Sequence, residues 1–428
     1  AVLSAQQFSV EETNRYPGSI MDPARMASNF AGVQGSDDSR NDIVIRGNSP
    51  LSVVWKVEGI DIPNPSHFAI SGSTGGPVSI LNNKILGNSD FFMSAFPAEY
   101  GNSTSGVFDL KLRQGNNSRH EFTGQFGFLG TEFLAEGPLS KSGNSSYLIM
   151  GRYSTLSIFQ SLGIQIGTDA IPVYGDGAFK FNWRLKNGGM LSWFGIGGKS
   201  KIDILISDQT TFTDELYGES DRDQLFGTSM GVTGINYKKS LNEKTYITAT
   251  LGASFEEQHT DHIYLNRSLD TNTQTQEINI TVDSSFNLMS YDFMKAKLTS
   301  YFAVNHKFNK RNIIKFGFNA EGMFMSQKDS IRTSYISTAP FNNRWDYRGV
   351  SCLVQPFVQY KLRVNNNMDF TAGIHSQYFS LSNSISIAEP RVGWKYRYGN
   401  GQSVFAGAGM HSQTQPNYTY TYHLLDNL

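Results

Sequence analysis

Few residues of this chain have the types and spacing that chemistry requires. His259 and His262 could offer imidazole ligands to a metal ion. In an extended segment, residues three positions apart point to opposite faces, so we favour solvated histidines. Residues 195–200 read GIGGKS and resemble the end of a phosphate-binding loop, but Trp193 occupies the position of its first glycine. We therefore expect neither a metal nor a nucleotide here.

The segment 208–223 is rich in carboxylates. They could bind Ca²⁺, but they lack the ordered Asp-x-Asp-x-Asp-Gly spacing of a calcium loop, which favours a solvated acidic loop. The chain also contains no His-Glu-x-x-His pair. The sequence therefore predicts no enzyme, no catalytic residue, no cofactor and no metal site.

Binding residues are expected in turn-rich loops near the N-terminus. Short apolar runs alternate there with loops at 64–68 (NPSHF) and 71–77 (SGSTGGP). Such loops lie on surfaces and carry binding residues out of proportion to their length. His67 could bind a ligand, although a lone loop histidine is more often solvated or hydrogen-bonded. Phe91, Phe92 and Phe96 could form an aromatic binding shelf, but we favour core packing for them.

The elements that position these loops are short. Asp22 is a good N-cap and Pro23 suits the first helical position, so a short helix is expected over 22–30. The apolar runs at 43–45, 53–55 and 107–112 predict strands. Together they form a small mixed domain ahead of a long all-β segment.

Composition favours a β-rich membrane protein over a soluble enzyme. The chain has 428 residues and a net charge of −1, so no basic field would recruit nucleic acid. Charged residues make up 17% and aromatic residues 13%, which is typical of a barrel with aromatic girdles. Cys352 is the only cysteine, so an intrachain disulfide is excluded.

From residue 119 onward, apolar and polar residues alternate with the period of a β-strand. The pattern is cleanest where Phe179, Phe181 and Trp183 alternate with Lys180 and Asn182. An apolar face toward lipid and a polar face toward a wet lumen account for it. We expect about 12 or 13 antiparallel strands before residue 416. Short turns should alternate with long loops at 154–173, 202–224, 258–287 and 326–350.

Motifs spread along the chain resemble TonB-dependent outer-membrane receptors of the Bacteroidota type. IVIRG, VEGIDIPNP, PAEYG and SGVFDLKLRQG are similar to the plug domain of that family. EGPLSK, EPRVGWKYRY and GMHSQTQP are similar to its barrel segments. The resemblance implies an α+β plug domain at 1–117 inside a transmembrane β-barrel at 118–428. Barrels of this family have about 22 strands, so part of the barrel is expected outside this chain.

The resemblance also implies a function. A receptor of this family imports a nutrient across the cell outer membrane, and TonB pulls on an upstream Ton box to release the plug. The implied nutrient is a siderophore, cobalamin, a peptide or a glycan, and outer-membrane lipid surrounds the barrel. An ion-pair lock between plug and barrel is assigned to Arg46 and Glu99. The substrate-binding residues expected at the plug apex are Asn64, Ser66, His67 and Phe68.

Other assignments stay open. The plug ends in EYGNSTSGVFDLKLRQG rather than a run like YGSRGANGVILVTT, so a SusD-type lipoprotein partner is not favoured. The alternative function is a structural or adhesive outer-membrane barrel with a permanent plug. A soluble extracellular β-rich protein is a weaker third candidate. Residues 1–12 resemble neither a signal peptide nor a Ton box, so both are expected upstream.

Overall fold

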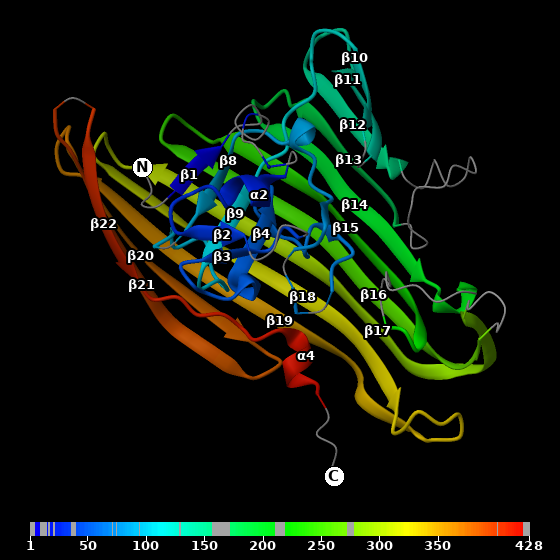
Figure 1. The fold of residues 1–428 in the computed structure, drawn as a ribbon. Coiled ribbons are helices and arrows are strands. Elements are labelled where there is room, and N and C mark those ends of the chain that lie inside the picture. Colours follow the sequence, from blue (N-terminus) through cyan, green and yellow to red (C-terminus); the bar gives the residue numbers. More distant parts are fainter. Residues whose placement is uncertain are drawn as a thin grey trace.

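The computed structural model describes residues 5–8, 15, 18–19, 22–35, 40–70, 72–73, 75–93, 95–127, 130–155, 172–209, 219–271, 278–399 and 401–422. A curved 13-stranded sheet dominates the structure, and the N-terminal region lies against its concave face (Figure 1). Within the described ranges, no helix is both long and apolar enough to cross a bilayer.

The large sheet is antiparallel throughout, and each strand pairs with the next one in the sequence. The expected count of 12 or 13 strands is confirmed. β10 and β22 form the two edges of the sheet. The strands are β10 (Glu121–Gly127), β11 (Gly130–Pro138), β12 (Ser145–Tyr153), β13 (Val173–Arg184), β14 (Met190–Ile204), β15 (Arg222–Ser240), β16 (Thr245–Thr271), β17 (Ile278–Lys307), β18 (Asn312–Arg332), β19 (Phe341–Arg363), β20 (Met368–Phe379), β21 (Ser384–Arg397) and β22 (Ser403–Gly409).

The two faces of this sheet are the reverse of those of a soluble protein. Its outer face exposes large apolar side chains, such as Leu298 at 67% and Val350 at 76%. Its inner face buries polar ones, such as Lys180 at 4% and Asn182 at 3%. The alternation predicted for this part of the chain is therefore confirmed. A continuous apolar outer band is the surface that suits lipid.

Two of the predicted long loops are wrong. Most of 258–287 belongs to β16 and β17, and most of 326–350 belongs to β18 and β19. Both strand pairs continue their hydrogen-bond ladders well beyond the apolar band. Alternation fades there because both faces can meet water, so the sequence resembles a loop while the backbone stays paired. Of the predicted loop at 154–173, residues 156–171 lie outside the described residues. Of the predicted loop at 202–224 and its acidic segment 208–223, residues 210–218 lie outside them; the described remainder contains the end of β14, the 3-10 turn η3 (Ile206–Asp208) and the start of β15.

The N-terminal region contains a five-stranded mixed sheet of order β1-β8-β9-β4-β5, in which β4 and β9 are parallel. Asp22 caps helix α2 by accepting from the Ala24 backbone N–H at 2.8 Å, as predicted, but the helix ends at Ala27. The elements are β1 (Ala5–Phe8), α2 (Pro23–Ala27), β2 (Val33–Gly35), β3 (Ile43–Ile45), η1 (Pro50–Ser52), β4 (Val53–Val57), β5 (Ile60–Asp61), β6 (Ser66–His67), β7 (Val78–Ser79), η2 (Asn83–Ile85), β8 (Ser89–Phe92) and β9 (Gly106–Leu110).

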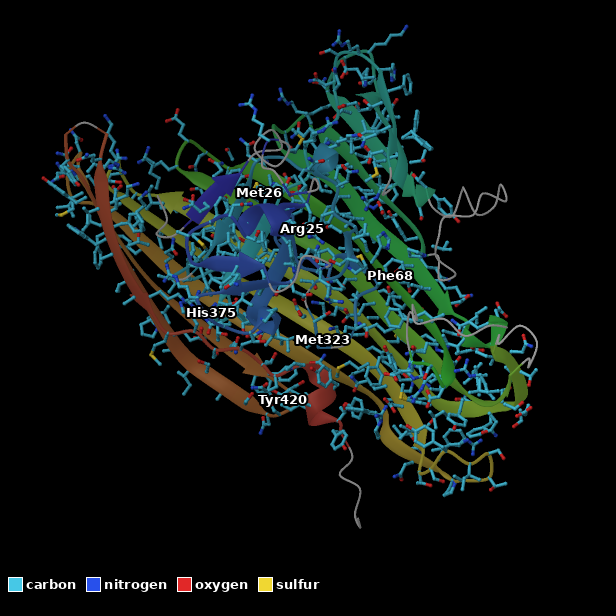
Figure 2. All side chains as sticks on the ribbon, in the orientation of Figure 1. Arg25, Met26, Phe68, Met323, His375 and Tyr420 are labelled. Carbon is cyan, nitrogen blue, oxygen red and sulfur yellow. The ribbon has the colours of Figure 1, made fainter. Side chains whose placement is uncertain are left out.

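The main hydrophobic core is shared between this region and the inner face of the large sheet. It joins Phe91 and Phe108 of the N-terminal sheet to Phe194 of β14 and Phe357 of β19. Phe91, Phe92 and Phe96 are 0%, 3% and 1% exposed. The predicted core packing of these residues is therefore confirmed, and they do not form an exposed aromatic binding shelf. Figure 2 shows side chains filling the space between the N-terminal region and the large sheet. The N-terminal region is therefore seated on the sheet by apolar burial as well as by polar contacts.

Candidate functional site

A cavity of about 560 Å³ lies between the N-terminal region, the inner face of β16–β20 and the segment that follows β22. We call it the central cavity. Its volume falls in the range of small-molecule sites. Met323 lies on its wall, and Figure 2 shows this residue between the N-terminal region and α4 (Asn417–Tyr420). Its lining mixes side-chain amides, hydroxyls, thioethers and aromatic rings with a few charged groups.

The charged groups of the central cavity have partners. Asp61 accepts from Lys56, and Glu256 pairs with Lys295. On the same wall, Lys297 Nζ lies 3.2 Å from Glu321 Oε2. Among the described lining residues, each carboxylate is thus matched by an ammonium group.

Asn64 alone of the four predicted binding residues lines the central cavity. It lies between β5 and β6, where its Nδ2 donates to the Gly75 carbonyl at 3.0 Å. That bond fixes the orientation of the amide. Its Oδ1 is buried and has no hydrogen-bond partner within the described part of the chain. Asn64 therefore carries an unpartnered acceptor beside the cavity, with almost no exposed surface of its own.

Ser66, His67 and Phe68 lie beside Asn64 but are seated against the large sheet. Ser66 Oγ donates to Asn41 Oδ1 at 3.3 Å, inside the N-terminal region. The Phe68 backbone N–H donates to Ser200 Oγ of β14 at 3.0 Å. Phe68 has a φ of 56° and is 8% exposed. The structure thus separates these residues from the cavity face that Asn64 occupies.

His67 is buried against β13. Its Nε2 lies 2.9 Å from Asp176 Oδ2, and Arg152 Nη2 lies 2.7 Å from the same oxygen. Burial lowers the pKa of His67, and the opposing effect of Asp176 does not restore its ordinary value. We therefore treat this contact as a neutral imidazole donating its Nε2–H to the carboxylate. The ion pair at this position is the one between Asp176 and Arg152.

The two residues of the predicted plug–barrel lock differ in their contacts. Glu99 accepts a hydrogen bond from Tyr301 at 3.0 Å and pairs with Lys315, so it does join the N-terminal region to the sheet. Arg46 is exposed, with a φ of 51° in the turn after β3. Within the described residues, no ion pair joins Arg46 to a carboxylate.

Ionic contacts that the sequence analysis missed lie on the β11–β15 side. Glu58 is 4% exposed in the tight turn between β4 and β5, where its own φ is 51°. Lys180 Nζ lies 2.5 Å from its Oε1, and Lys238 Nζ lies 3.4 Å from its Oε2. Burial raises the pKa of Glu58, but the two lysines outweigh burial and hold that pKa below its ordinary value. Nearby, Arg113 Nη1 lies 2.6 Å from Glu136 Oε2.

The sequence contained one indication of the ionic contact between Glu58 and Lys180. Lys180 stands on the polar face of the cleanest predicted strand, so a buried partner for it was to be expected. Glu58 gave no such indication because its VEGIDIP context resembles an ordinary turn. Only the fold brings these residues together, across 122 positions of sequence.

On the β19–β21 side, the loop 96–101 is held mainly through its backbone. Arg391 donates to the Pro97 carbonyl at 2.7 Å and also to the Tyr100 carbonyl. His375 Nδ1 lies 2.8 Å from the Ala98 carbonyl, and the Ala98 N–H donates to Gln359 at 3.0 Å. A Cβ on Gly101 would lie 2.1 Å from His375 Nε2, so only glycine fits. Figure 2 shows His375 and Phe68 toward opposite sides of the N-terminal region.

The segment 410–422 closes one end of the central cavity. Gln413 Nε2 donates to the Leu51 carbonyl at 2.8 Å, and the Thr414 N–H donates to Asn102 Oδ1 at 2.8 Å. Trp345 Nε1 of β19 donates to the Tyr418 carbonyl at 2.8 Å. This segment therefore contacts the N-terminal region and the large sheet at once.

The solved structures that this chain resembles include two receptors and an outer membrane transporter. A mutant of the ferric enterobactin receptor PfeA from Pseudomonas aeruginosa matches with a TM-score of 0.63 and 14% identity, over 97% of this chain and 62% of its own. The outer membrane transporter YddB from Escherichia coli matches with a TM-score of 0.67 and 13% identity, over 96% and 61%. The siderophore receptor PirA from Acinetobacter baumannii matches with a TM-score of 0.63 and 14% identity, over 97% and 62%.

The chain has the fold of a TonB-dependent outer-membrane receptor. It is an antiparallel barrel sheet with a plug on its inner face, so the fold class predicted from the sequence is confirmed. The chain spans about 62% of the length of the first of these structures. No protein-family model matches the chain, and no curated protein matches it by sequence. The Bacteroidota type is therefore still a prediction.

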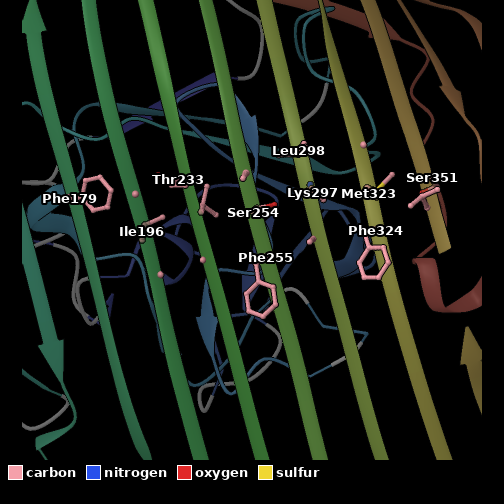
Figure 3. A pocket seen from close by; sticks show the side chains of 18 of the residues that line it. Phe179, Ile196, Thr233, Ser254, Phe255, Lys297, Leu298, Met323, Phe324 and Ser351 are labelled. Carbon is pink, nitrogen blue, oxygen red and sulfur yellow. The ribbon is translucent and has the colours of Figure 1, made fainter. Parts of the chain in front are cut away.

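A larger hollow of about 970 Å³ lies on the outer face of the barrel sheet (Figure 3). Small residues such as Gly177, Gly197 and Gly231 line it. Phe255 and Phe324 also belong to its lining, and Figure 3 shows their rings on β16 and β18. On a receptor barrel this apolar face meets lipid. A binding site needs convergent polar groups as well as room, so we place the candidate site at the central cavity.

Proposed function

We propose that this chain is part of an active importer of the cell outer membrane, with a plug at 1–117 that closes a barrel at 118–428. The observation that carries the proposal is the reversed sheet with a folded domain on its inner face. Apolar side chains outside suit a bilayer, and the inner face buries polar groups against the plug. A solute can cross such a barrel only when the plug moves.

The proposed energy source is TonB, acting on a Ton box upstream of this chain. The ionic contacts of Glu58, Arg113 and Glu99 with the barrel are suitable bonds to release. Paired charges keep the plug seated, and water can solvate both partners when the plug is pulled away. Arg46, first predicted as a lock residue, has no such contact among the described residues, so we assign the lock to Glu99 and Glu58.

The proposed binding site is the central cavity, with Asn64 as its polar contact at the plug apex. Ser66, His67 and Phe68 support the loop that carries Asn64. Outer-membrane lipid is the proposed surrounding of the barrel. We do not propose a SusD-type partner, because the plug lacks that motif.

The test is uptake by cells carrying the full-length gene, with and without TonB. We expect uptake of one nutrient to depend on both the gene and TonB. A permanently plugged structural barrel is the second candidate, because the backbone-held loop 96–101 would also suit a plug that never moves. Membrane integrity that depends on the gene, without TonB-dependent uptake of any compound, would favour that candidate.

A further inference from the structure

We infer that the central cavity takes a net-neutral ligand with both hydrogen-bond donors and acceptors, of the amide or hydroxyl class. This inference rests on the proposed function, since it names the class of substrate for the same site. It is carried by three features of the lining: its charge balance, its unpartnered polar atoms and its flexible apolar side chains.

The charge balance argues against an anionic ligand. The lysines of the lining, Lys295 and Lys297, are each already paired with a carboxylate, and no arginine lines this cavity among the described residues. Proteins bind anions with unpaired arginine or lysine groups, because an unmatched charge is costly to remove from water. An anion here would have to break an existing pair and would face Glu256 or Glu321.

The unpartnered atoms favour a ligand that both donates and accepts. Asn64 Oδ1 and Glu321 Oε1 are buried acceptors without a partner in the described part of the protein, and Trp55 Nε1 is a buried donor in the same condition. All three residues line the central cavity. Each of these atoms has almost no exposed surface, so a ligand reaches it only when neighbouring side chains of the lining shift. Buried polar groups in native proteins are nearly always hydrogen-bonded, so each of them then favours a ligand group of the opposite kind. Amide and hydroxyl groups supply donors and acceptors together, whereas an anionic chelate supplies mainly acceptors.

The apolar part of the lining is flexible. Met323 and Met325 lie on β18 in the cavity wall. Unbranched thioether side chains adapt to ligands of irregular shape. The wall can therefore contact the carbon skeleton of a peptide, an oligosaccharide or a neutral chelate, while the amides contact its polar groups.

The experiment is titration calorimetry on the full-length receptor, purified in detergent. The probes are a capped neutral peptide, a neutral oligosaccharide, a neutral ferric trihydroxamate and an anionic ferric tricatecholate. We expect one neutral probe to bind at least about tenfold more tightly than the tricatecholate. The neutral probe that binds identifies the source of the ligand. Tighter binding of the tricatecholate, or no binding of any neutral probe at millimolar concentration, would overturn the inference.

Two variants locate the binding in this cavity. Asn64→Leu removes the free acceptor, and Trp55→Phe removes the free donor while keeping an aromatic ring. Each variant should weaken the binding of the neutral probe by roughly tenfold, which is the effect of losing one buried hydrogen bond. Asn366→Leu, at an exposed turn, is the matched control and should leave affinity unchanged. If both cavity variants behave like this control, the ligand binds elsewhere and the inference is wrong.

Binding to purified receptor needs no energy, so the two proposals can fail separately. TonB-dependent uptake of the tricatecholate would support import and contradict the neutral ligand. Tight binding of a neutral probe that cells never import would support the ligand class and contradict the transport function.

Discussion

The plug is held to the barrel in two different ways on its two sides. On the β11–β15 side, charged side chains of the plug meet charged side chains of the barrel, as at Glu58 and Lys180. On the β19–β21 side, barrel side chains hold the backbone of the loop 96–101, as Arg391 does at Pro97. The first side depends on which plug residues are present. The second depends on the path of the plug backbone and on the absence of a side chain at Gly101.

This difference has consequences for release of the plug. Ionic contacts weaken when water or a proton reaches one partner, so the first side can respond to its chemical surroundings. Contacts to backbone carbonyls survive most substitutions of the plug and fail only when the loop changes shape. We therefore expect contacts on the β11–β15 side to respond to pH and to substitution of plug side chains. Contacts on the loop side should respond only to changes in the backbone conformation of the loop 96–101.

The largest effect should come from breaking the Glu58 pair. The side chain of Glu58 is 1% exposed and that of Lys180 is 6% exposed. Glu58→Gln leaves a buried ammonium group without its partner, and should reduce the free energy of unfolding of the plug by about 3–5 kcal/mol. Denaturant titration of the full-length receptor in detergent measures the loss.

Two controls separate pairing from simple loss of charge. The double variant Glu58→Gln/Lys180→Met should recover much of the stability, because no buried charge is then left unpaired. Glu121→Gln disrupts the exposed pair with Arg119, and its effect should be close to zero. Equal effects of Glu58→Gln and Glu121→Gln would contradict the assignment of an ionic side.

A second, smaller effect tests the loop side. Gly101→Ala places a Cβ 2.1 Å from His375 Nε2 and 2.5 Å from Gln355 Nε2, both buried. Overpacking of this kind should cost about 1–3 kcal/mol and displace the loop. Faster hydrogen exchange across residues 96–101 would report the displacement. Gly151→Ala is the control, since a Cβ there meets no atom within 4 Å. A seated, slowly exchanging loop in Gly101→Ala would show that backbone geometry does not hold this side.

The sequence predicted the barrel well because its rule is local. At Phe179 and Lys180, the side-chain period and the reversed polarity can both be read from neighbouring residues. The N-cap at Asp22 is equally local, and it too was predicted correctly. The strand extensions at 258–287 were missed because polar strands beyond the bilayer lose that period while the partner strand still supplies backbone hydrogen bonds.

The candidate site was harder to predict because its contacts are distant in sequence. The loop that carries Asn64 was recognised from its turn residues. Nothing local indicated that His67 would turn away toward Asp176, 109 positions further on. Arg391 lies in the EPRVGWKYRY motif that carried the family resemblance, yet its role depends on carbonyls 291 and 294 positions away. Such pairings follow from plug docking, which no single stretch of sequence determines.

Acidification should loosen the ionic side, with an effect smaller than those of the two substitutions. The pKa of Glu58 is lowered in the folded protein, so its contribution is complete above the unfolded value of 4.5 and is lost as pH falls through the folded value. The pKa of His67 is also lowered, below 6.5. The unfolded chain therefore takes up a proton first, and stability falls as pH drops below 6.5.

The melting temperature of the plug should accordingly decrease in two stages as pH falls from neutral. His67→Gln keeps a donor toward Asp176, beside Arg152, but cannot be protonated, so it should reduce the upper stage and leave the lower stage unchanged. A profile unchanged by this variant would show that His67 does not contribute to the pH dependence.

The smallest effect concerns the segment 410–422, which touches the plug just beyond the loop 96–101. Thr414 Oγ1 donates to Asn102 Oδ1 at 3.0 Å, and the Thr414 N–H donates to the same oxygen. Thr414→Val removes only the hydroxyl bond and should cost about 1 kcal/mol. Hydrogen exchange at 102–105 should rise while exchange at 96–101 stays unchanged, because Arg391 and the packing of His411 on Phe96 still hold the loop in this variant. Faster exchange of both stretches would mean that the segment and the loop form one unit, which the hydroxyl bond of Thr414 helps to hold in place.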